Sequence, residues 1–418
     1  MRLLLLNTHS ALNSGDLAIT LAEMEILSSL NPRSITITSR TPALDRPALA
    51  PWSPRVLPPL IPAPSVFVGR AATLTGCAMN LCQMGDKSAL IREMRRCDLV
   101  ISSGGGYFWS NRRGFPGPMF LQNYLHLYLV KLLMKPMVLF PQSLGPAFNA
   151  TARRMLGSVL SSGEVTRVFV RERLSLAFLQ GLLPERTMKE KVELCGDVAF
   201  CLETRPDASS LPAGPDLPAP IIAVTVRRWD FPEVRETAEK SRLQDAYLDA
   251  LATACATVGR RHGGSVLVFP QSRGPGEFED DRPVSRGFAQ RLAAKAPDLP
   301  VQYVPLPDTA SPFDIIRLLT QAHLVVATRF HSAILGFLAG VPAVSIAYQP
   351  KSRGIMEEMG FDELTIDISA VDANRLIEMM SRVLDDHASM AADIRDRVMG
   401  LRRQIRETTL RAVRHAVT

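Results

Sequence analysis

The sequence lacks the signatures of several protein classes. Its 418 residues contain six cysteines, with no CxxC pair and no Cys/His spacing typical of a metal site. The longest apolar stretch, Met119 to Phe140, is interrupted by polar and charged residues and a proline, which predicts a helix followed by a strand. These absences argue against a disulfide-rich scaffold, a structural zinc site and a membrane-spanning protein.

Signatures of nucleotide and nucleic-acid binding are also missing. No P-loop lysine accompanies the glycine-rich segment 104–106, and the segment does not match GxGxxG. The formal charge of +7 favours anionic partners such as phosphorylated substrates, although a mildly basic surface without functional meaning is an equal alternative. The basic residues are scattered and form no stripe with aromatic residues, so nucleic acid is not an expected partner.

The cysteines and the first residues predict a compartment. Cys97, Cys195 and Cys255 lie in or beside apolar runs and are expected to be buried and reduced. The apolar run of the opening MRLLLLNTHS is too short for a signal peptide and predicts a buried strand. The expected location is the cytoplasm, and peripheral contact with its membrane face stays open.

Apolar strands alternate with helices in both halves of the chain. This pattern predicts an α/β protein with two Rossmann-like domains that face a cleft, each with a parallel sheet flanked by helices. The expected parts are an N-terminal domain (1–205), a Pro-rich linker (206–220), a C-terminal domain (221–390) and a basic helix (391–418). The segment 41–65 holds eight prolines and is predicted to be a loop or an extended arm.

The basic C-terminal helix has two interpretations. Its pattern covers Ser389 to Thr418 and ends in a series of arginines. A solvated face of a helix packed on the other domain is the favoured interpretation. Contact with anionic lipid head groups is the functional alternative.

The strongest site signal follows the apolar strand HLVVAT. Arg329 and His331 come directly after it, at a turn into a helix, and Lys351 follows the next strand. Ligands of parallel sheets bind beyond the carboxyl ends of strands, where arginine suits a carboxylate or phosphate and histidine exchanges a proton near neutral pH. We therefore expect acid chemistry on an anionic substrate, with His331 as the first candidate and His9 as the second.

Further candidates follow the strands of the N-terminal half. Asn13 and Asp16 lie in a turn that either caps a helix or contacts an anion or a sugar, and Asp16 is a candidate base. Three glycines, where close backbone approach to a phosphate or sugar is expected, are Gly104, Gly105 and Gly106.

Two similar loops follow buried strands, one from Pro141 to Pro146 and one from Pro270 to Pro275. They predict equivalent loops in related domains, with chance similarity as the alternative. The first loop contributes two candidate substrate contacts, Gln142 and Ser143. The second leads into the acidic run 277–281, which is interpreted as a solvated loop in preference to a metal site.

Arg171 and Asp197 stand at two more strand ends. Arg171 is a candidate clamp for a carboxylate, or else forms a surface ion pair with Glu172 or another acid. Asp197 either positions a substrate hydroxyl or caps the following turn.

Together these elements resemble the polysaccharide pyruvyl transferases. The resemblance runs in order from residue 13 to 351 and omits the Pro-rich segment and the basic helix. Its motifs are Asn13-Ser14-Gly15-Asp16, Gly104-Gly105-Gly106, Pro141-Gln142-Ser143-Leu144-Gly145-Pro146, Arg171 with Glu172 and Ser175, Gly196-Asp197, Arg329-Phe330-His331, Gly340-Val341-Pro342 and Tyr348 with Lys351.

The resemblance implies a GT-B-like fold and transfer of pyruvate from phosphoenolpyruvate to a sugar diol. The product would be a cyclic ketal, phosphate would leave, and neither a cofactor nor a metal is expected. Arg171 and Arg329 would hold the carboxylate and phosphate of the donor, and His331 would act in catalysis. The N-terminal domain would take the acceptor and the C-terminal domain the donor.

Chemistry agrees with this role for His331. A ketal requires a proton on the methylene carbon of the donor, which a protonated imidazole can supply with a typical rate gain of ~10²–10⁴. Two alternatives remain: a GT-B glycosyltransferase that uses a nucleotide sugar, and a non-catalytic protein that binds a glycan or lipid carrier. The acceptor sugar is free, nucleotide-linked or lipid-linked.

Overall fold

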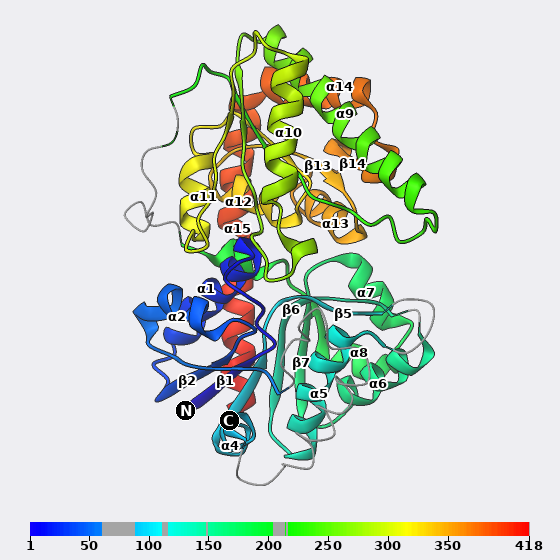
Figure 1. The fold of residues 1–418 in the computed structure, drawn as a ribbon. Helices are drawn as coiled ribbons and strands as arrows, with labels where there is room; N and C mark the ends of the chain where they lie inside the picture. The colour runs from blue at the N-terminus through cyan, green and yellow to red at the C-terminus, as the bar shows by residue number, and fades with distance from the viewer. Residues whose placement is uncertain (61–87, 111–115, 148, 204–213, 215, 418) are drawn as a thin grey trace. The chain divides into compact units, whose positions relative to one another are not determined.

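A computed structural model describes residues 1–60, 88–110, 116–147, 149–203, 214 and 216–417. The chain forms two compact units, each built on one parallel sheet (Figure 1). The first unit comprises Met1–Ala11, Ile19–Leu202 and Arg402–Thr418. The second comprises Leu12–Ala18 and Glu203–Leu401. The segment Leu12–Ala18, which carries the Asn13 to Asp16 motif, therefore belongs to the second unit.

The sheet of the first unit has the order β3-β2-β1-β4-β6-β7-β8, and β5 pairs with β6. Its central strands β1 and β4 are apolar at nearly every position, as expected where helices cover both faces of a parallel sheet. The strands are β1 (Arg2–Leu6), β2 (Ser34–Thr38), β3 (Arg55–Leu57), β4 (Leu99–Ser102), β5 (Gly105–Ser110), β6 (Met137–Ala147), β7 (Val165–Val170) and β8 (Val192–Leu194).

The helices of the first unit pack apolar residues onto this sheet. Residues of α5, α6, β6 and β7 share one hydrophobic core, in which Leu127, Leu156 and Val168 are fully buried. The helices are α1 (Ser14–Ser28), α2 (Pro42–Leu49), α4 (Ala89–Arg96), α5 (Pro118–Leu132), α6 (Ala150–Leu160), α7 (Arg173–Gln180) and α8 (Glu185–Lys191), of which α1 begins in the second unit.

The sheet of the second unit has the order β11-β10-β9-β12-β13-β14. Counted along the unit, this is the order 3-2-1-4-5-6 of dinucleotide-binding folds. The order reverses between β9 and β12, so the carboxyl ends of these two strands flank the crevice where such sheets bind ligands. The strands are β9 (Ile221–Thr225), β10 (Ser265–Val268), β11 (Val301–Tyr303), β12 (Leu324–Ala327), β13 (Ala343–Ala347) and β14 (Thr365–Asp367).

Helices flank this sheet as well, and α9 packs against both α10 and α14 (Figure 1). Helix α11 begins with a capping box, in which Ser311 and Asp314 satisfy each other's backbone N–H groups. The helices are α9 (Thr237–Arg261), α10 (Arg282–Lys295), α11 (Pro312–Leu319), α12 (Phe330–Leu338), α13 (Pro350–Glu358), α14 (Ala373–Asp385) and α15 (His387–Val417), of which α15 ends in the first unit.

The prediction of a loop or arm for the Pro-rich segment 41–65 is wrong for its described part. Pro42 occupies the first turn of α2, where a missing N–H breaks no helical bond, and β3 follows in the same segment. Asp45 of α2 accepts hydrogen bonds from the Ala11 backbone N–H (2.9 Å) and the Thr41 hydroxyl (2.8 Å). Residues 61–65 lie outside the described residues, as does most of the predicted linker 206–220.

The predicted burial of three cysteines is confirmed. Cys97, Cys195 and Cys255 are buried, as the apolar runs around them predict. Among the described residues, no helix is both long and apolar enough to cross a membrane.

Candidate active site

His331 lies in the first turn of α12, just beyond the carboxyl end of β12. Its imidazole packs directly on the α-carbon of Gly15, so that a β-carbon at residue 15 would overlap the ring. The Phe330 ring meets the imidazole edge-on, with centroids 4.8 Å apart. The structure thus brings the Asn13 to Asp16 motif and His331 together within the second unit, although about 315 residues of chain separate them.

The loop from Pro270 to Pro275 holds the Asn13 to Asp16 segment in place. Arg273 donates from Nη1 to the Ser14 hydroxyl (2.8 Å) and from Nη2 to the Ala310 carbonyl (2.8 Å). Its backbone N–H donates to the Leu12 carbonyl (2.8 Å). Burial lowers the pKa of Arg273 to about 10, below its usual value.

Arg329 is fixed by Asp281, a residue of the acidic run. Its Nε and Nη2 donate to the two carboxylate oxygens at 2.9 Å and 2.6 Å, and Nη2 also donates to the Glu279 carbonyl (3.1 Å). Burial by itself lowers the pKa of Arg329, but the facing Asp281 carboxylate raises it above its usual value. Arg329 Nη1 donates no hydrogen bond to any of the described residues, so this group is available to a ligand.

Two arginines at the end of β9 were missed from the sequence. The guanidinium carbon of Arg227 lies 4.0 Å from the ring centroid of Tyr348 and 4.9 Å from that of Trp229. The neighbouring Arg228 stacks on the exposed ring of Phe278 at 4.7 Å. The run VRRW after a buried strand was the available signal, and only the fold places it beside the strand that leads to Arg329.

The first unit gathers a second group of predicted residues around Arg171. Arg171 is 2% exposed and donates from Nη1 to Asp197 (2.6 Å) and from Nε to the Ser143 hydroxyl (2.8 Å). Ser143 in turn donates to Glu172 (2.9 Å). Burial by itself lowers the pKa of Arg171, but Asp197 and Glu172 raise it above its usual value. Asp197 also caps the turn η2 (Val198–Cys201) through the Ala199 N–H at 2.9 Å.

The glycine segment packs against protein. A β-carbon on Gly104 would lie 2.8 Å from the Pro141 carbonyl oxygen, and Gly105 has a φ of +124°. Gly105 and Gly106 belong to strand β5, which the sequence did not predict. The Gln142 side chain crosses to β4 and donates to the Ser102 hydroxyl (2.9 Å).

Glu23 of α1 is hydrogen-bonded to the start of this segment. Its carboxyl group is fully buried and accepts from the Gly104 N–H and the Ser103 hydroxyl, both at 2.7 Å. Burial raises the pKa of Glu23 to about 8. This acid was not a sequence candidate, because a glutamate inside a helix carries no local sign that it is buried.

Other predicted groups are placed as follows. Lys351 lies in α13, but its side chain is outside the described residues. His9 stacks on Tyr107 with ring centroids 5.3 Å apart and hydrogen-bonds Arg40. No cluster of three or more metal-ligating side chains is found in the part of the chain that the structure describes.

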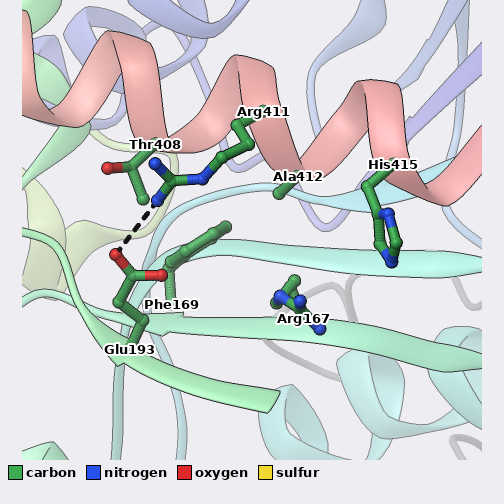
Figure 2. Close-up of a pocket in the computed structure, with 7 residues that line it drawn as sticks. All are labelled: Arg167, Phe169, Glu193, Thr408, Arg411, Ala412 and His415. Carbon is green, nitrogen blue, oxygen red and sulfur yellow. Dashed lines mark ion pairs between the residues drawn. The ribbon is translucent and has the colours of Figure 1, made fainter. Parts of the chain in front are cut away.

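The end of the C-terminal helix, from Arg402 on, packs within the first unit. Arg402 donates to the carbonyls of Phe200 and Leu202, each at 3.0 Å, and Val413 is fully buried. A cavity of about 150 Å³ lies between this helix and strands β7 and β8 (Figure 2). Figure 2 shows the ion pair of Arg411 with Glu193 (3.5 Å) at its border. Its lining residues are Arg167, Phe169, Glu193, Thr408, Arg411, Ala412 and His415.

The fold defines a class. The structure is similar to HepE from Anabaena in complex with UDP and glucose, with a TM-score of 0.58, 15% identity, and coverage of 98% of this chain and 99% of that one. It is also similar to the UDP-GlcNAc 2-epimerase of Neisseria meningitidis, with a TM-score of 0.58, 11% identity and coverage of 99% of both chains. Two parallel sheets flanked by helices, with these neighbours, define the GT-B fold.

The chain belongs to the polysaccharide pyruvyl transferase family, whose model matches residues 13–350. It is 25% identical to the amylovoran biosynthesis protein AmsJ of Erwinia amylovora over 319 residues, which are 74% of this chain and 72% of AmsJ. Both findings support a transferase in polysaccharide biosynthesis.

Proposed function

We propose that the protein transfers pyruvate from phosphoenolpyruvate to two hydroxyls of a sugar in a polysaccharide or its precursor. The observation that carries this proposal is the geometry around His331. The imidazole of His331 comes two residues after Arg329, whose guanidinium is fixed by Asp281, and it packs on Gly15, where a side chain would have no room. An acid beside an anion-binding group is what protonation of phosphoenolpyruvate requires.

The reaction proceeds through two additions at one carbon. His331 donates a proton to the methylene carbon of phosphoenolpyruvate, which becomes a methyl group, and the adjacent carbon becomes cation-like. A sugar hydroxyl attacks that carbon and loses its proton to a base, for which Asp16 is the candidate. Phosphate then leaves, and the second hydroxyl attacks the same carbon, loses its proton and closes the ketal ring.

The cations would keep the donor in position. Arg329 presents Nη1 while Asp281 fixes the rest of its guanidinium, so little side-chain freedom is lost on binding. Arg171 remains the other predicted donor contact, and Lys351 remains a predicted substrate contact. Gln142, Ser143 and the glycine segment remain predicted substrate contacts. The membrane contact of the C-terminal helix also stays a prediction.

The test is release of phosphate from phosphoenolpyruvate with free, nucleotide-linked and lipid-linked sugars as acceptors. Wild type should release phosphate only with an acceptor, and His331→Ala should lose about 10²-fold or more in rate. His262→Ala is the matched control, since His262 follows α9 at the opposite end of the sheet from His331. If phosphoenolpyruvate neither binds nor reacts while a nucleotide sugar is consumed, the protein is a glycosyltransferase and the proposal fails.

A further inference from the structure

Arg227 stands at the position where a parallel sheet of this order binds ligands. It follows β9, and Arg329 follows β12, the adjacent strand across which the strand order reverses. The two loops are tied together, because the Tyr247 hydroxyl hydrogen-bonds the Thr328 hydroxyl (3.0 Å) and the backbone of Arg227. This link holds the two guanidinium groups in neighbouring places.

Arg329 has a carboxylate partner among the described residues, and Arg227 does not. Asp281 forms a bidentate ion pair with Arg329. No carboxylate of the described residues forms an ion pair with Arg227. Burial first, and then the positive charge of Arg329, lower the pKa of Arg227. The group of Arg227, Arg329 and Asp281 therefore carries one positive charge in excess.

The surroundings of Arg227 fix its orientation while they leave its charge uncompensated. Trp229 and Tyr348 contact the guanidinium, and their rings lie 4.7 Å apart at 52°. Gln244 holds the loop through the Arg227 carbonyl (3.1 Å) and the Trp229 N–H (3.0 Å). The Arg227 Nε also donates to the Arg228 carbonyl (3.2 Å), and the guanidinium hydrogen-bonds the Tyr348 side chain. Because these bonds and the aromatic contacts already order the side chain, ordering costs little when an anion binds.

We propose that Arg227 is a substrate-binding residue that contacts the anionic oxygens of the donor, with the free edge of Arg329 beside it. The inference rests on the proposed function for the identity of the donor, phosphoenolpyruvate, whose carboxylate and phosphate share this chemistry. A partly buried cation without a carboxylate partner is costly to keep, and an anionic substrate supplies the missing partner.

The test compares Arg227→Ala and Arg227→Lys with Arg228→Ala, whose side chain is the next one along and stacks on Phe278. Binding of phosphoenolpyruvate, pyruvate and inorganic phosphate is measured by calorimetry, together with kcat and KM for phosphoenolpyruvate. Arg227→Ala should weaken donor binding and raise KM by about ten- to a hundred-fold. Arg227→Lys should recover part of this loss, and Arg228→Ala should resemble wild type.

The two smaller anions tell which donor group Arg227 contacts. A loss confined to pyruvate assigns the carboxylate, and a loss confined to inorganic phosphate assigns the phosphate. The Tm of Arg227→Ala should equal or exceed that of wild type, because the side chain lost is an uncompensated charge. A lower Tm with unchanged KM would assign a structural role and overturn the inference.

The outcomes separate this inference from the proposed function. If wild type turns over phosphoenolpyruvate and Arg227→Ala does so with the same KM, only the inference about Arg227 fails. If wild type does not bind phosphoenolpyruvate, the proposed function fails, and binding of inorganic phosphate and pyruvate decides on Arg227 as an anion contact. Binding of neither anion, or binding that Arg227→Ala leaves unchanged, would overturn it as well.

Discussion

At the scale of single residues, the site depends on one glycine that leaves room for one histidine. Gly15→Ala places a methyl group where the imidazole of His331 now lies. We expect transfer activity to fall by at least ten-fold because the ring must move, and a shift of about 1 Å at a catalytic group can cost ~10²-fold. Steady-state kinetics with phosphoenolpyruvate as the varied substrate measures the effect.

Gly287→Ala is the control for Gly15→Ala. Gly287 lies inside α10, and a β-carbon there meets nothing within 4 Å. This variant should keep full activity and gain about 1 kcal/mol in the free energy of unfolding, since alanine favours a helix over glycine. Equal activity of the two variants would show that Gly15 does not define the place of His331.

The buried ion pair of Arg171 with Asp197 is expected to affect the stability of the first unit more than an exposed ion pair would. Arg171→Ala leaves Asp197 and Glu172 buried without their cation. We expect a loss of about 3–5 kcal/mol in the free energy of unfolding, measured by urea denaturation. The exposed bidentate pair of Arg260 with Asp298 provides the comparison, and Arg260→Ala should cost much less than Arg171→Ala because solvent screens the exposed pair. Equal costs would contradict the structural role of Arg171.

At the scale of elements, hydrogen bonds from the loop from Pro270 to Pro275 hold the Leu12–Ala18 segment in position. Arg273→Lys removes the paired bonds from one guanidinium to the Ser14 hydroxyl and the Ala310 carbonyl. Hydrogen exchange should then speed up at the backbone amides of this segment, with little change in the core strands of the second unit. Arg286→Lys on α10 is a suitable control. Unchanged exchange in the segment would mean that the remaining backbone bonds suffice to hold it.

The same elements show how far the sequence predicts the site. The strand, turn and helix around His331 were predictable, because an apolar strand followed directly by polar residues and an apolar helix is a local pattern. The partnership with Gly15 was not, since it depends on contacts such as Arg273 to Ser14, which spans 259 residues. The role of Arg227 could not be predicted from the sequence for the same reason. Only the strand order places the end of β9 beside the end of β12.

The short helix α2 and strand β5 were not predicted from the local sequence. Eight prolines argue against regular structure, yet Pro42 lies in a first helical turn, where its missing N–H costs nothing. The triple glycine predicted close backbone approach to a ligand, and the structure adds a packing requirement, because Gly104 lies close to the Pro141 carbonyl and Gly105 begins strand β5. In both places contacts with other parts of the chain determine the local structure, and the local composition does not predict those contacts.

At the scale of the whole molecule, Glu23 links stability to pH. Its pKa is raised from 4.5 to about 8 in the folded chain, so between these values the folded state holds a proton that the unfolded state has released. The stabilising contribution is therefore complete below pH 4.5 and is lost as pH rises toward 8. Glu23→Gln keeps both hydrogen-bond positions without the titration, and its stability should fall less than that of wild type between pH 5 and pH 8.

Urea denaturation at several pH values measures this difference. Glu190→Gln changes an exposed glutamate of the same unit and should follow the wild-type curve. Parallel curves for wild type and Glu23→Gln would show that Glu23 titrates alike in the folded and unfolded chain, which would contradict its burial as a neutral acid.

The central claim is that a proton reaches the methylene carbon of phosphoenolpyruvate at His331 during transfer to a sugar. Transfer run in D₂O, followed by NMR of the product, tests it most directly. The account predicts a cyclic ketal whose methyl group carries one deuterium, formed by wild type and His262→Ala and not by His331→Ala. A ketal without deuterium, or one formed at the wild-type rate by His331→Ala, would contradict it.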